Sequence, residues 1–146
     1  MTKRRTNNQS FAGIPRAVLL HKDYQNLSGN AVKLLLDLAF QYRGGNNGDL
    51  TTAFNVLKVR GWTSRATIDR AKKQLLLNEL IKETRPGQFI NPGGRCALYA
   101  LTWAAIDECP GKSLACKASG IAPRSFKPQL ESKMPCLDMR QGSASF

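Results

Sequence analysis

Residues 60–78, RGWTSRATIDRAKKQLLLN, contain the pattern from which the fold is predicted. Gly61 to Thr63 read as a short turn, and Ser64 is a good N-cap for a helix that we expect to run to about Asn78. The predicted inward stripe of this helix is formed by residues at helical spacing: Ile68, Ala71 and Leu75. The stretch is therefore predicted to be a turn followed by a helix with one buried side.

The opposite side of this helix is polar and cationic. Turning 100° per residue from the inward stripe places five residues on the outward face: Ala66, Asp69, Arg70, Lys73 and Leu77. Arg65 and Lys72 flank this face, and Asp69 has Arg65, Lys72 and Lys73 within reach of a local ion pair. The pattern is that of an exposed helix face that can contact a polyanion.

Upstream, a longer helix is predicted over residues 28–43, capped by Ser28. One apolar stripe consists of Ala31, Leu34, Leu35, Leu38 and Tyr42. A second stripe consists of Val32, Leu36 and Phe40, so the helix is apolar over more than half its girth. We therefore expect it to be the central helix of the core.

Shorter elements flank this helix. Residues 14–21 indicate a strand running into a short helix, with Pro15 in the first helical turn. The glycine- and asparagine-rich residues 44–48 predict a tight loop, and residues 49–50 a very short strand that pairs with a later hairpin. Thr51 is expected to cap a helix through about Lys58 that buries Phe54 and Leu57. Trp62 and Trp103 are expected in the core.

Downstream, residues 80–85 and 95–103 alternate as strands do, and residues 86–94 between them are rich in turn formers. They predict a β-hairpin with a long tip. Beyond residue 106 the apolar period disappears. Residues 107–146 are predicted to be a mostly irregular basic tail with short ordered patches around Phe126 and Leu130, and residues 1–13 a flexible basic arm.

Charge is the strongest global feature. The 146 residues contain 22 Lys and Arg against 10 Asp and Glu, which gives a net charge of +12 and a pI near 10.0. Residues 14–106 contain thirteen basic and six acidic residues, so most of the excess lies on the predicted folded part. Such an excess attracts polyanions, because phosphate contacts release condensed counterions.

Other classes of function find little support. His21 is the only histidine and has no evident carboxylate or cysteine partner, and no phosphate loop or nucleophile elbow is present. The four cysteines, Cys96, Cys109, Cys116 and Cys136, form no Cys-x-x-Cys pair. We expect no catalysis, metal or cofactor. No apolar run spans a bilayer and the N-terminus lacks the apolar region of a signal peptide, so a cytoplasmic protein with reduced thiols is expected.

Helix, short turn, helix and hairpin is the order of a winged helix-turn-helix, so the predicted fold is mainly α with a small β-hairpin wing (α+β) over residues 14–106. Five stretches resemble bacterial helix-turn-helix proteins found in phages and other mobile elements: LSGNA at 27–31, NNGDL at 46–50, RGWTSRATI at 60–68, LIKETRPG at 80–87 and YALTW at 99–103. The resemblance covers about residues 14–108. In outline the winged part is also similar to the DNA-binding domains of plasmid replication initiators and MarR-like regulators.

The resemblance implies binding of double-stranded DNA, and the leading hypothesis is a dimeric transcriptional regulator of a mobile element that reads an inverted repeat. The expected DNA-binding residues are Ser64, Arg65, Ala66, Asp69, Arg70 and Lys73 in the helix and Arg85 and Arg95 in the wing. Arg70 is the best candidate for a guanine contact, and Lys3, Arg4 and Arg5 for a minor groove. Two alternatives stay open: a replication or partition accessory protein, and a protein-binding inhibitor whose long tail wraps a host partner.

Overall fold

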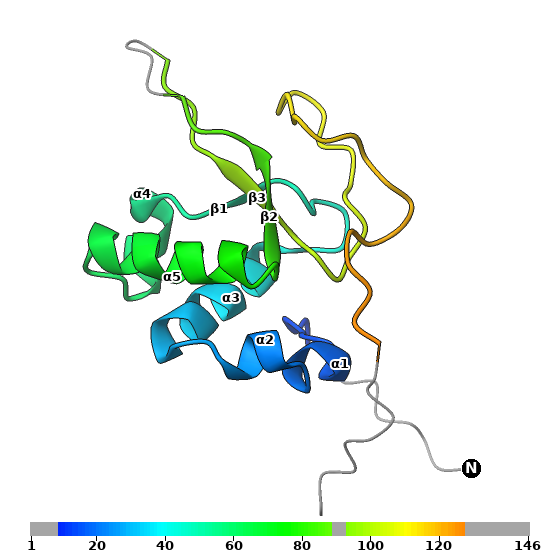
Figure 1. Ribbon diagram of the computed structural model, residues 1–146. Helices are drawn as coiled ribbons and strands as arrows, with labels where there is room; N and C mark the ends of the chain where they lie inside the picture. The colour runs from blue at the N-terminus through cyan, green and yellow to red at the C-terminus, as the bar shows by residue number, and fades with distance from the viewer. Residues whose placement is uncertain (1–8, 89–92, 128–146) are drawn as a thin grey trace, which may run out of the picture.

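The computed structural model describes residues 9–88 and 93–127, and in these residues the fold is α+β (Figure 1). In chain order the elements are α1 (Arg16–Leu19), α2 (Lys22–Gln25), α3 (Gly29–Gln41), β1 (Leu50–Thr51), α4 (Phe54–Leu57), the 3-10 helix η1 (Lys58–Arg60), α5 (Arg65–Leu77), β2 (Ile81–Arg85) and β3 (Leu98–Leu101). The two long helices, α3 and α5, pack on each other, and the sheet follows directly from the end of α5.

Both long helices begin where their capping residues predict. The side chain of Ser28 accepts a hydrogen bond from the backbone N–H of Ala31, and Ser64 caps the N–H of Thr67 in the same way. α3 ends at Gln41, two residues before its predicted end. Asn46 explains the early stop, because its side chain binds the Gln41 carbonyl at 2.9 Å and the Arg43 N–H at 2.7 Å.

Only one of the two predicted stripes of α3 is in the core. Ala31, Leu34, Leu35 and Leu38 are fully buried together with the inward stripe of α5. By contrast, Leu36 is 50% exposed and Phe40 is 56% exposed. The helix therefore belongs to the core, as expected, but only through its first stripe, because α5 and β1 pack on that side of it.

The sheet has the order β1-β3-β2 and is antiparallel throughout. The very short strand predicted at 49–50 is present one residue later as β1, which pairs with β3. The predicted hairpin is confirmed as β2 and β3. A register shift between Glu83 and Arg85 interrupts the β2–β3 ladder, which resumes with Arg85 opposite Leu98. An isolated bridge between Gln88 and Arg95 continues the hairpin beyond it, so β3 proper is shorter than predicted.

The start of α4 differs from the prediction. Thr51 lies in β1, and its hydroxyl accepts from the N–H of Ala53 at 3.1 Å, whereas α4 begins only at Phe54 with Ala53 as its N-cap. The side chain of Gln41 holds Thr51 in the sheet, because it accepts from the Thr51 N–H and donates to the Thr51 carbonyl, both at 2.9 Å. This contact joins α3 to β1, and the local spacing from which helix caps are predicted gives no indication of it.

The N-terminal elements are two short helices, and the strand expected in residues 14–21 is absent from the described structure of that stretch. Pro15 precedes α1 as its N-cap instead of occupying the first turn. The unpredicted α2 begins after His21, whose ring nitrogen Nδ1 accepts from the N–H of Asp23 at 3.1 Å.

Asn47 joins the predicted loop at 44–48 to the end of the sheet. Its buried side-chain amide donates to the carbonyls of Leu101, Ala104 and Ala105 and accepts from the Leu101 N–H at 2.8 Å. Its own N–H donates to the carboxylate of Asp107 at 2.8 Å. The side chain of Asn47 thus supplies hydrogen-bond partners to backbone groups that no strand or helix pairs.

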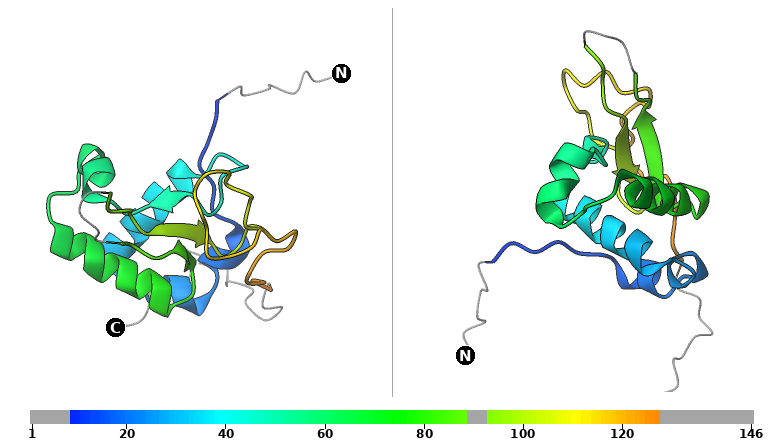
Figure 2. Two further views of the ribbon diagram at one scale, coloured as in Figure 1. Left: turned by 90° about the horizontal axis from the view of Figure 1, so that it is seen from above. Right: turned by 90° about the vertical axis from the view of Figure 1, so that its left-hand side faces the viewer.

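Residues 107–127 contain neither helix nor strand, yet they pack on the domain, on the side of the sheet remote from α4 (Figures 1 and 2). The N–H of Ala115 donates to the Thr84 carbonyl of β2, and the N–H of Arg124 donates to the Thr102 carbonyl. Phe126 packs against the core, which agrees with the ordered patch predicted around this residue. Leu130, the centre of the second predicted patch, lies outside the described residues. The segment leaves the outward side of α5 uncovered.

Candidate nucleic-acid interface

The structure places the predicted outward residues of α5 on one exposed face. Ala66, Asp69, Arg70, Lys73 and Leu77 are all exposed, and Arg65 is exposed beside them. The predicted inward stripe is buried, with Ile68 3%, Ala71 1% and Leu75 0% exposed. We call the set formed by Ala66, Asp69, Arg70, Lys73 and Leu77 the outer face of α5. The helix is thus oriented as the sequence predicted.

A buried acid on α3 fixes the turn that leads into α5. Trp62 is in the core, as expected, and its indole N–H donates to the Asp37 carboxylate at 2.6 Å. The same carboxylate pairs with Arg60 at 3.2 Å and with Lys33 at 3.5 Å. Gly61 permits the turn with a φ of 91°, in the region that favours glycine. Asp37 is thus a central positioning residue that the sequence reasoning did not identify.

Local pairs organise the charges of α5. Lys72 binds the carboxylate of Asp69 at 3.3 Å, which is one of the three ion pairs considered for this residue. Arg70 reaches the hydroxyl of Thr67 only at 3.5 Å, so its fork remains open to solvent. Four basic residues and one acidic residue lie on α5, so its field is positive where the helix is exposed.

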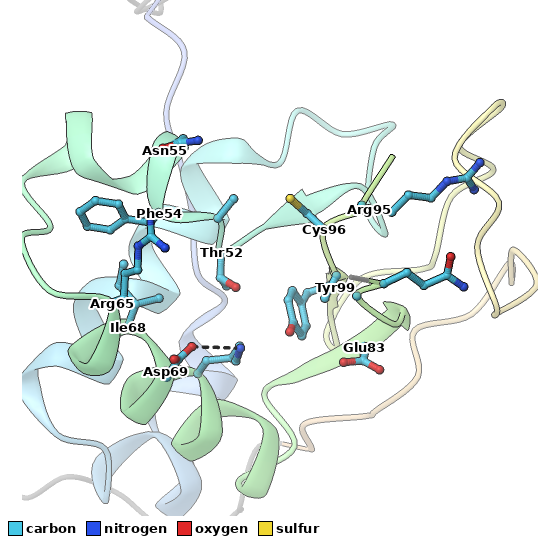
Figure 3. A pocket seen from close by; sticks show the side chains of 16 residues that line it. Thr52, Phe54, Asn55, Arg65, Ile68, Asp69, Glu83, Arg95, Cys96 and Tyr99 are labelled. Atoms are coloured by element: carbon cyan, nitrogen blue, oxygen red, sulfur yellow. Dashed lines mark hydrogen bonds and ion pairs between the residues drawn. The ribbon is translucent and has the colours of Figure 1, made fainter. Parts of the chain in front are cut away.

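A cleft of about 640 Å³ lies between α5 and the hairpin (Figure 3). Its walls come from the start of α4, the N-terminal half of α5, β3 and both sides of the hairpin. Ile68 and Tyr99 are its buried lining residues, and Arg65 and Arg95 lie on opposite sides of it. The fold therefore brings Arg65 of the helix and Arg95 of the hairpin to one concave site, which we call the α5–hairpin cleft.

The phenol of Tyr99 keeps its proton in this cleft. Burial raises the pKa of Tyr99 above its ordinary value of 10.0, nearby Lys72 lowers it in part, and Glu83 raises it further. At neutral pH the side chain is therefore a neutral hydrogen-bond donor, in a cleft lined by the cations of Arg65, Lys72 and Arg95 and by the carboxylates of Asp69 and Glu83.

The two wing arginines have different surroundings. The guanidinium of Arg85 donates to the Cys96 carbonyl at 2.7 and 3.2 Å and to the Lys112 carbonyl at 2.9 Å. It therefore braces the base of the hairpin against the C-terminal segment. The side chain of Arg95 is exposed, and its backbone pairs with Gln88 through two bonds of 2.9 Å. Lys3, Arg4 and Arg5 lie outside the described residues.

His21 does have a carboxylate neighbour, contrary to the sequence reading. Its ring lies 3.5 Å from Asp23, which also pairs with Arg124 of the C-terminal segment. Arg124 additionally donates to the carbonyls of Asn78 and Glu79 at the end of α5. The group joins α2, α5 and the C-terminal segment.

Among residues 9–88 and 93–127, no cluster of three or more His, Cys, Asp or Glu side chains is placed to hold a metal ion. No helix within those ranges has both the length and the apolar character needed to cross a membrane. Comparisons of the chain with models of protein families, with curated proteins and with solved structures find no match.

Proposed function

We propose that this protein is a winged helix-turn-helix protein that binds double-stranded DNA through the outer face of α5. The order of elements supports the fold: α3, the short β1, α4, η1 with the turn at residues 61–64, α5 and then the β2–β3 hairpin, with strand order β1-β3-β2. In this interpretation α4 and α5 are the helix-turn-helix pair and the hairpin is the wing.

The observation that carries the proposal is the exposed cationic face of α5 on a helix whose other side is locked in the core. A major groove admits one α-helix, which needs an exposed polar face on a rigid support. The buried stripe of α5 and the Asp37–Trp62 bond supply the support. Arg70 and Lys73 supply donors on the face that would enter the groove.

The residues take different roles in this proposal. Arg70 has a fork that suits O6 and N7 of a guanine, a contact worth about 1–3 kcal/mol of discrimination. Lys73, Arg65 and Arg95 contact phosphates, which orient the protein and make its affinity depend on salt. Arg85 acts indirectly by holding the wing, because its donors are already bound to backbone carbonyls.

Regulation of a mobile element by a dimer is the finer part of the proposal, and it rests on the resemblance described above. A dimer that reads two half-sites selects an inverted repeat, with centres about one helical turn or a multiple of it apart. The sequence of the selected site therefore reports on the oligomeric state as well as on the DNA.

The experiment is selection of duplexes from a random library by the full chain, followed by binding curves at several stated salt concentrations. The variant Arg70→Ala/Lys73→Ala removes two cations of the outer face. Arg16→Ala/Lys22→Ala is the matched control, because it removes the same charge from exposed positions on α1 and α2. We expect the first variant to lose the selected site and the control to retain it. Equal losses in both, or an enriched site bound unchanged by the first variant, would contradict the proposal.

A further inference from the structure

Phe54 and Arg65 form a contact at one side of the α5–hairpin cleft (Figure 3). The guanidinium carbon of Arg65 lies 5.1 Å from the centre of the Phe54 ring, within the range of a cation–π interaction. Phe54 begins α4, is half-buried and packs against the core. Arg65 begins α5 and is exposed. A ring anchored by the core thus holds a side chain that solvent can reach.

The geometry of a guanidinium determines what this contact leaves free. A ring contacts one flat face of the group, whereas the N–H donors point outward in its plane. The contact with the ring therefore restricts the rotamers of Arg65, and the planar fork of N–H donors of this side chain matches two oxygens of one phosphate. An arginine ordered before binding has less conformational entropy to lose when it binds.

We propose that Phe54 is a positioning residue that holds Arg65 ready to bind a phosphate of the DNA backbone rather than a base. This inference rests on the proposed function. Arg65 lies against α4 at the side of the cleft, whereas Arg70 and Lys73 lie on the outer face of the same helix. Arg65 thus contributes affinity that is uniform across sequences, and Arg70 contributes the discrimination.

The test uses Phe54→Leu, which keeps an apolar side chain but removes the ring, and Phe54→Tyr, which keeps the ring. Binding to the selected duplex and to a scrambled duplex is measured for both, alone and combined with Arg65→Ala. A cation–π contact at an exposed site corresponds to about a two- to fivefold change in affinity. We expect Phe54→Leu to weaken both duplexes by that factor, Phe54→Tyr to bind as the unaltered chain does, and Phe54→Leu to add nothing in the Arg65→Ala background.

A direct readout separates positioning from a general effect on folding. The Nε–H resonance of Arg65 is shifted by the current of the ring above it, and we expect this shift to vanish in Phe54→Leu and to persist in Phe54→Tyr. Circular dichroism of each variant establishes that it is folded. Additive losses in the double variant, a weakening confined to the selected duplex, or an Arg65 resonance that ignores Phe54→Leu would overturn the inference. Failure of the unaltered chain to bind any duplex would instead overturn the proposed function, and the inference with it.

Discussion

Replacement of Asp37 by alanine is expected to destabilise the fold more than any exposed charge change, because this carboxylate holds three partners. The side chain of Asp37 is 8% exposed, and its partner Trp62 is itself buried. Loss of the acceptor leaves the indole N–H unpaired in the core, which costs about 1–3 kcal/mol. The two ion pairs add less, since Lys33 and Arg60 are 45% and 40% exposed and such pairs contribute about 0–1 kcal/mol each.

The expected total is about 1–5 kcal/mol of unfolding free energy. Urea denaturation followed by far-ultraviolet circular dichroism measures it. The control is Asp69→Ala, which removes an ion pair from a carboxylate that is 60% exposed, and we expect a change within about 0.5 kcal/mol. The variant Trp62→Phe deletes the N–H donor but keeps an aromatic ring, so Asp37→Ala should cost less in its background. Equal effects of Asp37→Ala and Asp69→Ala, or full additivity with Trp62→Phe, would refute this reasoning.

Three further outcomes follow from the same contacts. Leu36→Ala should change the unfolding free energy by no more than about 1 kcal/mol, whereas Leu35→Ala, at the adjacent buried position, should lower it by about 2–5 kcal/mol. Denaturation curves that give the two variants the same unfolding free energy would contradict the exposure of Leu36. Because the pKa of Tyr99 is raised, the folded state holds the phenol proton more tightly than the unfolded state does. The stabilisation from this proton is complete below pH 10.0 and is lost as the pH rises from 10.0 through the pKa of the folded state. The fall in unfolding free energy between pH 9 and 11 should therefore be smaller in Tyr99→Phe. Arg124→Ala should speed amide hydrogen exchange in residues 107–127 while α3 keeps its protection, and exposed Lys127→Ala should change neither.

Features encoded by local spacing were predictable from the sequence. Ser28 and Ser64 lie next to the N–H groups that they cap, and the buried stripe of α5 follows from a period of 3.6 residues. The outward placement of Arg70 and Lys73 follows from the same period. For these positions a single helix contains all the information that the prediction needs.

Contacts between distant segments were not predictable in this way. Asp37 stands in an apolar run, and its partner Trp62 is 25 residues away, so no spacing rule relates them. Asn47 read as an ordinary loop residue, although it binds a strand end 54 residues away. Leu36 and Phe40 have the same residue types and spacing as core positions, yet they are 50% and 56% exposed, and Phe40 is covered only in part, by the guanidinium of Arg60. Arg85 likewise is predicted to be free for DNA, whereas its guanidinium donates to the carbonyl of Lys112, 27 residues away.

The C-terminal segment has a practical consequence for how the protein can be shortened. β2 is an outer strand of the sheet, and Ala115 and Cys116 bind the carbonyls of Thr84 and Glu83 along it. Strands with unsatisfied edges pair with neighbouring molecules. A recombinant chain cut after Ile106 is therefore expected to self-associate with rising concentration. A chain that extends to Lys127 keeps the segment that covers β2 and is expected to aggregate less.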